Sequence, residues 1–125
     1  MEVYNRWDRL QRLGQGGFFG PEEIGRSAVS RASRIVAQLP GVRLIPGAGM
    51  KTRVRIHRTN DCAPSVYVDG IRSGTSDEVG IDDLVPATAL EMIEVYRGLA
   101  ELPGELADDN ARRCGAIGLW TQRGR

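Results

Sequence analysis

Histidine, aromatic residues and long apolar runs are all scarce in this sequence of 125 residues. The single histidine, His57, lies in a stretch where polar and apolar residues alternate, which favours a surface position, and no histidine-based catalytic set can be assembled around it. No apolar run reaches the roughly 20 residues of a membrane-spanning helix. Residues 1–13 carry too much charge for the apolar part of a signal peptide. We therefore expect no enzyme, no membrane-spanning segment and no export signal in this chain.

Cysteine is also scarce, since Cys62 and Cys114 are the only two. One pair without neighbouring histidines does not make a zinc site. Each cysteine stands just before an expected strand, where two neighbouring strands could bring the sulfur atoms together. A disulfide would stabilise the fold by about 4 kcal/mol on the chain-entropy model, and it would indicate an oxidising compartment. The alternative is two free thiols.

Lysine occurs once, and the charges of the two signs are separated along the chain. Residues 1–60 hold eleven basic and four acidic side chains, residues 61–111 hold two and twelve, and residues 112–125 hold four and none. In a compact domain such blocks pair across the fold, and arginine favours bidentate pairing with carboxylates. The spacing of the acidic residues fits no calcium-binding loop, so no metal site and no cofactor are expected.

A single long helix is expected from Glu22 to Leu39. Apolar residues recur there at helical spacing, beginning with Ile24. Pro21 suits the first position of a helix, and the step Pro40-Gly41 ends it.

Short extended runs make up most of the remaining pattern. The expected elements are strands Val42 to Ile45, Thr52 to Arg58, Ser65 to Val68, Met92 to Arg97 and Ala116 to Gln122, with either a short helix from Ile81 to Leu90 or a helical turn on either side of Pro86. Glycine and proline lie between these runs, which predicts long loops, among them the polar segments 72–80 and 98–113. The order of elements predicts an α+β fold in which a small mixed β-sheet packs with one long and one short helix.

The stretch Thr52 to Arg58 alternates strictly. This predicts a strand with Val54 and Ile56 on its buried face and the side chains Arg53, Arg55 and His57 on its solvated face. Arg53, Arg55 and Arg58, together with the arginines of the expected helix, are the basis for an alternative function in nucleic-acid binding. The acidic middle of the chain opposes that alternative, so no nucleic-acid partner is expected.

Four motifs in one order along the chain carry a resemblance. They are Val66-Tyr67-Val68-Asp69-Gly70, Asp83-Leu84-Val85-Pro86, Ile93-Glu94-Val95-Tyr96-Arg97-Gly98 and Gly115-Ala116-Ile117-Gly118-Leu119-Trp120-Thr121. In this order and spacing the chain resembles the plug domain of TonB-dependent outer-membrane receptors. The helix followed by Pro40-Gly41-Val42 is similar to the family's step into its first core strand. The resemblance covers roughly residues 18–123, so we expect a lead-in over residues 1–17 and a plug-like domain over residues 18–125.

The resemblance implies a non-catalytic module that gates the β-barrel of a receptor, contacts a small ligand through its apical loops and is reached by TonB from the periplasm. It implies a location at the outer membrane or in the periplasm. It also implies that Cys62 and Cys114 form a disulfide, since some members pair cysteines at these two places. The alternative is a free-standing periplasmic or cell-envelope domain that uses the plug fold to bind a protein.

The family motifs also nominate contact residues. Candidates for contact with the barrel are Asp69, Gly70, Glu94, Arg97 and Gly98, with Glu94 and Arg97 as the best of them. The alternative for this pair is that they are ordinary exposed charges at the end of a strand. Candidates for contact with the ligand, in the loops 72–80 and 102–112, are Arg72, Asp77, Asp108 and Asn110.

The sequence departs from the family pattern in three ways. No convincing TonB box precedes the helix, and Leu99 stands where the family usually has proline. No barrel sequence follows Arg123, so we expect that transport is not carried by this chain alone.

Overall fold

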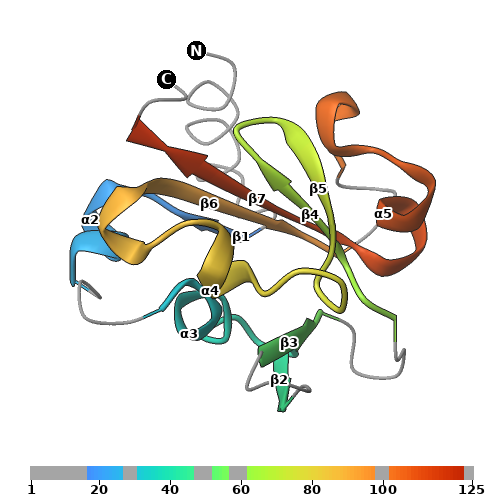
Figure 1. The fold of residues 1–125 in the computed structure, drawn as a ribbon, viewed down its shortest axis with the longest axis horizontal. Helices are drawn as coiled ribbons and strands as arrows, with labels where there is room; N and C mark the ends of the chain where they lie inside the picture. The colour runs from blue at the N-terminus through green and yellow to red at the C-terminus, as the bar shows by residue number, and fades with distance from the viewer. Residues whose placement is uncertain (1–16, 27–30, 47–51, 57–61, 98–101, 123–125) are drawn as a thin grey trace.

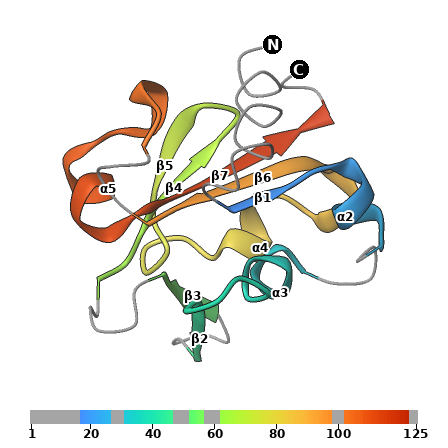
Figure 2. The same cartoon turned by 180° about the vertical axis from the view of Figure 1, so that it is seen from behind.

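The fold is described by a computed structural model over residues 17–26, 31–46, 52–56, 62–97 and 102–122. A five-stranded sheet with strand order β1-β6-β7-β4-β5 forms its centre, and a separate two-stranded sheet pairs β2 with β3. Figures 1 and 2 show α3, α4 and the small sheet together on one side of the large sheet. In the described part of the chain, no helix is both long and apolar enough to span a membrane.

The elements are short throughout. The strands are β1 (Gly17–Phe19), β2 (Arg43–Pro46), β3 (Thr52–Arg55), β4 (Ser65–Val68), β5 (Ile71–Thr75), β6 (Leu90–Tyr96) and β7 (Ala116–Thr121). The helices are α2 (Pro21–Arg26), α3 (Ala32–Val36), α4 (Ile81–Leu84) and α5 (Asp109–Cys114), with single 3₁₀ turns η2 (Ala87–Ala89) and η3 (Gly104–Leu106). The mixed α+β architecture predicted from the sequence is confirmed.

One parallel pair makes the large sheet mixed. β4 runs parallel to β7, from Ser65 opposite Ala116 to Val68 opposite Leu119, while every other pairing is antiparallel. Parallel neighbours need a long crossover, and here it contains β5, α4, η2, β6, η3 and α5. As a result, β4 and β7 begin at the end of the sheet where β5 and β6 finish. We call this end the loop end.

Both faces of the large sheet are covered. On one face the apolar side chains of β4, β6 and β7 pack with those of α2, α3 and α4; this core includes Val66, Ile93, Ile117, Leu119, Ile24, Ile35, Val36 and Ile81. A second cluster on the other face comprises Tyr67, Tyr96, Leu106, Ala111 and Ala116. Because strand side chains alternate between faces, β4, β6 and β7 contribute to both clusters.

The long helix expected from Glu22 to Leu39 is wrong. Two short helices take its place, and Arg31, just before α3, is extended with φ −81° and ψ 158°. α3 is fixed by tertiary contacts, because the backbone N–H and the Oγ of Ser33 donate to the carboxylate of Asp82 at 2.8 and 2.7 Å. A carboxylate beside the start of α3 satisfies a backbone donor that the first helical turn leaves free.

Three further expectations need correction. The expected elements include no strand before the first helix, but Gly17–Phe19 is β1 and pairs with β6. The polar segment 72–80 contains most of β5, which pairs with β4, and the segment 98–113 contains η3 and most of α5. In contrast, the helical turns on either side of Pro86 are confirmed as α4 and η2.

The solvated face predicted for the second strand is also wrong at Arg55, which is 3% exposed. Its two terminal nitrogens donate to the two carboxylate oxygens of Asp77 at 2.8 and 2.9 Å. A bidentate partner allows a guanidinium to be buried where an unpaired charge would be too costly. Val54 and Ile56 are buried as predicted, while His57 and Arg58 lie outside the described residues.

Candidate functional site

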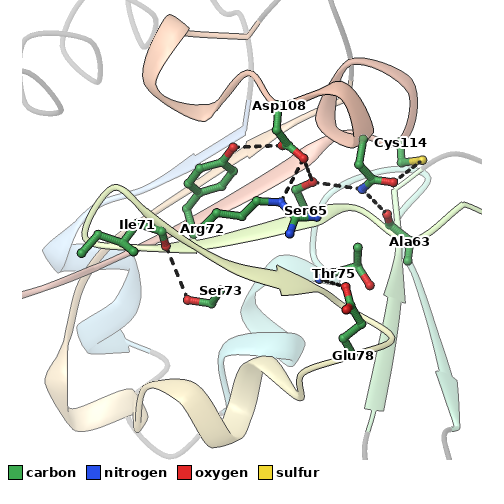
Figure 3. Close-up of polar contacts among 11 residues, drawn as sticks. Ala63, Ser65, Ile71, Arg72, Ser73, Thr75, Glu78, Asp108 and Cys114 are labelled. Atoms are coloured by element: carbon green, nitrogen blue, oxygen red, sulfur yellow. Dashed lines mark hydrogen bonds and ion pairs between the residues drawn. The ribbon is translucent and has the colours of Figure 1, made fainter.

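A polar network at the loop end of the sheet centres on the carboxylate of Asp108, which stands just before α5. Its Oδ1 accepts from the Tyr67 hydroxyl at 2.9 Å, and its Oδ2 accepts from Ser65 Oγ and Arg72 Nε, both at 3.0 Å. Figure 3 shows Arg72 and Ser65 reaching this carboxylate from the two strands of one hairpin. The network therefore ties β4 and β5 to the segment that carries α5.

The segment that carries Asp108 is anchored twice more. Asn110 Nδ2 donates to the carbonyl of Ala63 at 2.9 Å and to Ser65 Oγ at 3.0 Å. Cys62 and Cys114 form a disulfide with their Cα atoms 5.2 Å apart, which confirms the expected pairing. This bond joins the end of α5 to the chain that leads into β4, so Asp108 is held in place over the second face of the sheet.

The network sets the protonation states of its two titratable members. Burial raises the pKa of Tyr67, and so does its hydrogen bond to Asp108, so the phenol stays neutral and donates. Burial alone would raise the pKa of Asp108, but hydrogen bonds from Tyr67, Ser65 and Arg72 outweigh it and the net pKa is lowered. Asp108 is thus an anion at neutral pH.

Arg72 is the outermost member of the network. Its side chain is 40% exposed and that of Asp108 is 25% exposed. The guanidinium engages the carboxylate through Nε, so its terminal amino groups are not used in this pair. Ser65 and Tyr67, in contrast, are 0% and 6% exposed and act as an inner support.

Of the five residues in the Asp108 network, three were predicted from the sequence as candidates for ligand contact and two were not. Arg72, Asp108 and Asn110, expected in two different loops, are brought together, whereas the fourth nominee, Asp77, is the partner of Arg55. Ser65 and Tyr67 were read only as part of a buried strand. Ser65 and Tyr67 are two residues apart in a strand, so both side chains lie on the same face of β4. This spacing is the feature of the sequence from which their shared position could have been predicted.

The Asp69-Gly70 motif forms the turn between β4 and β5. Asp69 has φ +52° and Gly70 has φ +86°, the left-handed conformations that a two-residue hairpin turn requires. The Asp69 carboxylate accepts from the backbone N–H of Thr121 at 2.8 Å and from its hydroxyl at 2.7 Å. Asp69 therefore ties the hairpin tip to the end of β7, at the end of the sheet away from the Asp108 network.

Glu94 does not lie at the surface, so both its assignment as a barrel contact and the alternative of an exposed charge are wrong. It is 0% exposed in the middle of β6. Its Oε1 accepts from the Tyr96 hydroxyl and its Oε2 from Trp120 Nε1, both at 2.7 Å. Gly118 on β7 leaves room for this carboxylate, because a Cβ there would stand 3.2 Å from Oε2.

Arg97, directly after β6, is half-buried. Its terminal nitrogens donate to the carbonyl of Pro40 at 2.7 Å and, more weakly, to the carbonyl of Ile56 at 3.4 Å. It therefore joins the large sheet to the end of β3 and to the chain after α3. Gly98 lies outside the described residues.

A different kind of feature lies at the end of the sheet opposite the Asp108 network. It is a hollow of about 260 Å³ lined by Pro21, Ile24, Gly25, Thr88, Leu90, Glu91 and Gln122. In the described ranges, no group of three or more histidine, cysteine, aspartate or glutamate side chains is placed to hold a metal ion.

Comparison with protein families decides what this fold is. Residues 18–105, most of the chain, match the model of the TonB-dependent receptor plug domain. The chain belongs to this family. The resemblance expected from the four motifs is thus confirmed, and the proteins that carry such plug domains are outer-membrane receptors for transport rather than enzymes.

Solved structures share the plug fold. The ferric enterobactin receptor PfeA in complex with BCV-L6 matches with a TM-score of 0.63 and 24% identity, over 85% of this chain and 17% of the receptor. A mutant of the same receptor from Pseudomonas aeruginosa matches with a TM-score of 0.64 and 20% identity, over 90% of this chain and 18% of the receptor. This chain thus spans less than a fifth of the length of these receptors. No curated protein matches the sequence.

The Asp108 network lies across the end of the region that matches the family model. The model of the plug domain ends at residue 105, and Asp108, Asn110 and Cys114 come after it. The network is therefore built by joining a hairpin within the matched region to a segment beyond its end.

Proposed function

We propose that this chain is the gating plug of a TonB-dependent receptor, a non-catalytic module seated in a β-barrel whose lumen it closes. The observation that carries this proposal is the match of residues 18–105 to the plug-domain model, together with a fold that overlays plug-containing receptors over at least 85% of the chain. A barrel at the outer membrane and TonB on the periplasmic side are the proposed partners.

The surface of the described residues suits a module surrounded by water and polar barrel walls. Among the residues that the structure describes, only Leu44 and Ile71 are large apolar side chains with substantial exposure. The described part of the chain therefore has no exposed apolar patch large enough for a permanent hydrophobic interface. Of the two charges in the motif from Ile93 to Gly98, Arg97 is the one that stays partly exposed, and we retain it as the proposed contact with the barrel wall.

The loop end is the proposed ligand side. The ends of β5 and β6 and the starts of β4 and β7 meet there, and the Asp108 network and the disulfide make that end rigid. Both neighbouring structures are ferric enterobactin receptors, so a ferric chelate is the class of ligand that we propose.

Pore conductance tests the gating role. The matched part of PfeA is replaced by this chain, and the conductance of the chimera in a planar lipid bilayer is compared with that of intact PfeA and of PfeA without a plug. We expect the chimera to stay closed like intact PfeA. A chimera as open as the plug-deleted barrel, although masses before and after reduction show an intact Cys62–Cys114 bond, would reject gating. The free-standing interaction domain would then be the better account.

A further inference from the structure

We propose that this chain is a preformed plug, which folds without a barrel and docks into one in trans as a finished unit. The inference rests on the proposed function as a gating plug and adds the way in which plug and barrel associate. It is carried by residues 102–114, which we call the cover because their apolar side chains close the second face of the large sheet.

The cover completes the core from outside the region that matches the family. Leu106 and Ala111 are both 0% exposed. They belong to one cluster with Tyr67 and Tyr96 of the sheet. Because the match to the family model ends at residue 105, these two cover residues come from beyond it. The chain thus buries the apolar residues of both sheet faces with its own side chains, and this burial needs no barrel wall.

The cover also encloses a buried carboxylate. Glu94 was a candidate for contact with the barrel, but its two oxygens accept from Tyr96 and Trp120. Leu106 reaches the same place, since a Cβ added at Gly118 would stand 3.2 Å from Glu94 Oε2 and 3.4 Å from Leu106 Cδ1. The chain therefore supplies both the donors and the apolar shield that a buried carboxylate requires.

Asp69, a second candidate for contact with the barrel, is also engaged within the chain. Its carboxylate accepts from the backbone N–H and from the hydroxyl of Thr121, at 2.8 and 2.7 Å. Like Glu94, it makes two short hydrogen bonds that are complete without a partner protein. These two motif carboxylates therefore stabilise the isolated domain, which is what a plug that folds alone requires.

The cover is fixed in its closed position. The disulfide joins its last residue, Cys114, to Cys62 before β4. Asn110 adds hydrogen bonds to the carbonyl of Ala63 and to the hydroxyl of Ser65. In an oxidising compartment the cover therefore stays on the sheet whether or not a barrel surrounds the domain.

The remaining exterior suits association that is reversible. On the cover itself, the side chains of Asp109 and Arg112 are 93% and 53% exposed. Within the described ranges, Leu44 and Ile71 are the only large apolar side chains with substantial exposure. Permanent interfaces are more apolar than this. We therefore expect polar contacts with the barrel wall, which form and separate while the plug keeps its fold.

Folding without a barrel is the first test. The full oxidised chain is produced alone, and its mass in solution, its urea unfolding and its amide exchange are measured. We expect a monomer with one cooperative transition and with protected amides in β6 and β7.

Variants of the cover test its part in this stability. Leu106→Ala should lower the folding equilibrium constant by about 30-fold or more, because a buried leucine is truncated. Leu106→Met keeps the volume and should retain most of the stability, so it provides the comparison if Leu106→Ala does not fold. The matched control is Leu44→Ala in β2, at a position that is 36% exposed, which should change the constant by less than about threefold.

Docking in trans is the second test. PfeA without a plug is placed in a planar lipid bilayer, and the folded chain is added to the solution without being joined to the barrel. We expect the conductance to fall as the chain is added and to recover when it is washed out. Intact PfeA, whose lumen is already filled, is the control and should not respond to the added chain.

The outcomes separate this proposal from the proposed function. The preformed plug is overturned by a chain that is unfolded without a barrel, by an unchanged folding equilibrium after Leu106→Ala, or by a folded chain that leaves the plug-deleted barrel open although the covalent chimera is closed. In each case a closed chimera leaves the gating plug in place. An open chimera would overturn the proposed function itself. A chain that folds alone and closes the barrel reversibly supports both.

Discussion

The backbone of Gly115, which joins α5 to β7, lies against the carbonyl oxygen of Tyr96 at the end of β6. A Cβ at Gly115 would stand 2.6 Å from that oxygen and 3.0 Å from Ile56 Cδ1. The residue has φ +91° and ψ 175°, a conformation that essentially only glycine adopts. This close approach lets the segment that carries α5, which the disulfide joins to the chain before β4, pass over the loop end and continue into β7.

Gly115→Ala should therefore destabilise the fold by at least about 2 kcal/mol, from backbone strain and the clash together. Urea unfolding of the oxidised chain measures the difference. The matched control is Gly104→Ala in η3, where an added Cβ meets nothing within 4 Å and the change should stay within about 0.5 kcal/mol. Equal stability of the two variants would contradict the role assigned to Gly115.

The Arg55–Asp77 pair predicts an asymmetry between its two partners. Asp77→Ala leaves a guanidinium that is 3% exposed without its bidentate partner, and should cost about 2 kcal/mol. Arg55→Met should cost less, because methionine fills the buried space and the Asp77 side chain, 37% exposed, is reached by water. Chemical denaturation compares the two variants.

A surface pair provides the reference. Asp109, 93% exposed, makes a 3.5 Å ion pair with Arg112, and its replacement by alanine should leave stability nearly unchanged. The prediction is contradicted if Arg55→Met lowers the free energy of unfolding by more than Asp77→Ala does. That result would mean that the attraction within the pair exceeds the free energy needed to bury the Arg55 charge.

The predictions that succeeded came from local patterns. The strand Ser65 to Val68 is bounded by Pro64 and by the Asp69-Gly70 turn, and its limits are those of β4. The long helix failed at Arg31, because the apolar spacing runs on through a position where the backbone is extended.

Long-range contacts account for the rest. Alternation placed Arg55 on a solvated face, and only its partner 22 residues away explains its burial. Likewise, Asp108 meets Arg72, Tyr67 and Ser65 at separations of 36, 41 and 43 residues. No periodicity reports contacts at these distances, so the loops could be nominated from the family resemblance but their network could not.

The Asp108 network makes stability depend on pH at both extremes. The pKa of Asp108 is lowered in the fold, so its contribution is present above its unfolded value, near 3.8, and is lost as pH falls below that value toward the folded pKa. The pKa of Tyr67 is raised, so its contribution is present below 10.0 and is lost as pH rises through the folded pKa.

Unfolding free energies between pH 2 and 11 should therefore fall at both ends, and each end should respond to a different variant. Asp108→Asn should flatten the acidic limb relative to the unaltered chain, because the amide does not titrate. Tyr67→Phe should flatten the alkaline limb and leave the acidic limb shallower as well, since Asp108 then loses one of the donors that lower its pKa. Asp109→Asn, at an exposed position beside the network, is the control for a change of net charge. An acidic limb that is as steep in Asp108→Asn as in Asp109→Asn would show that another carboxylate is responsible for the loss of stability in acid.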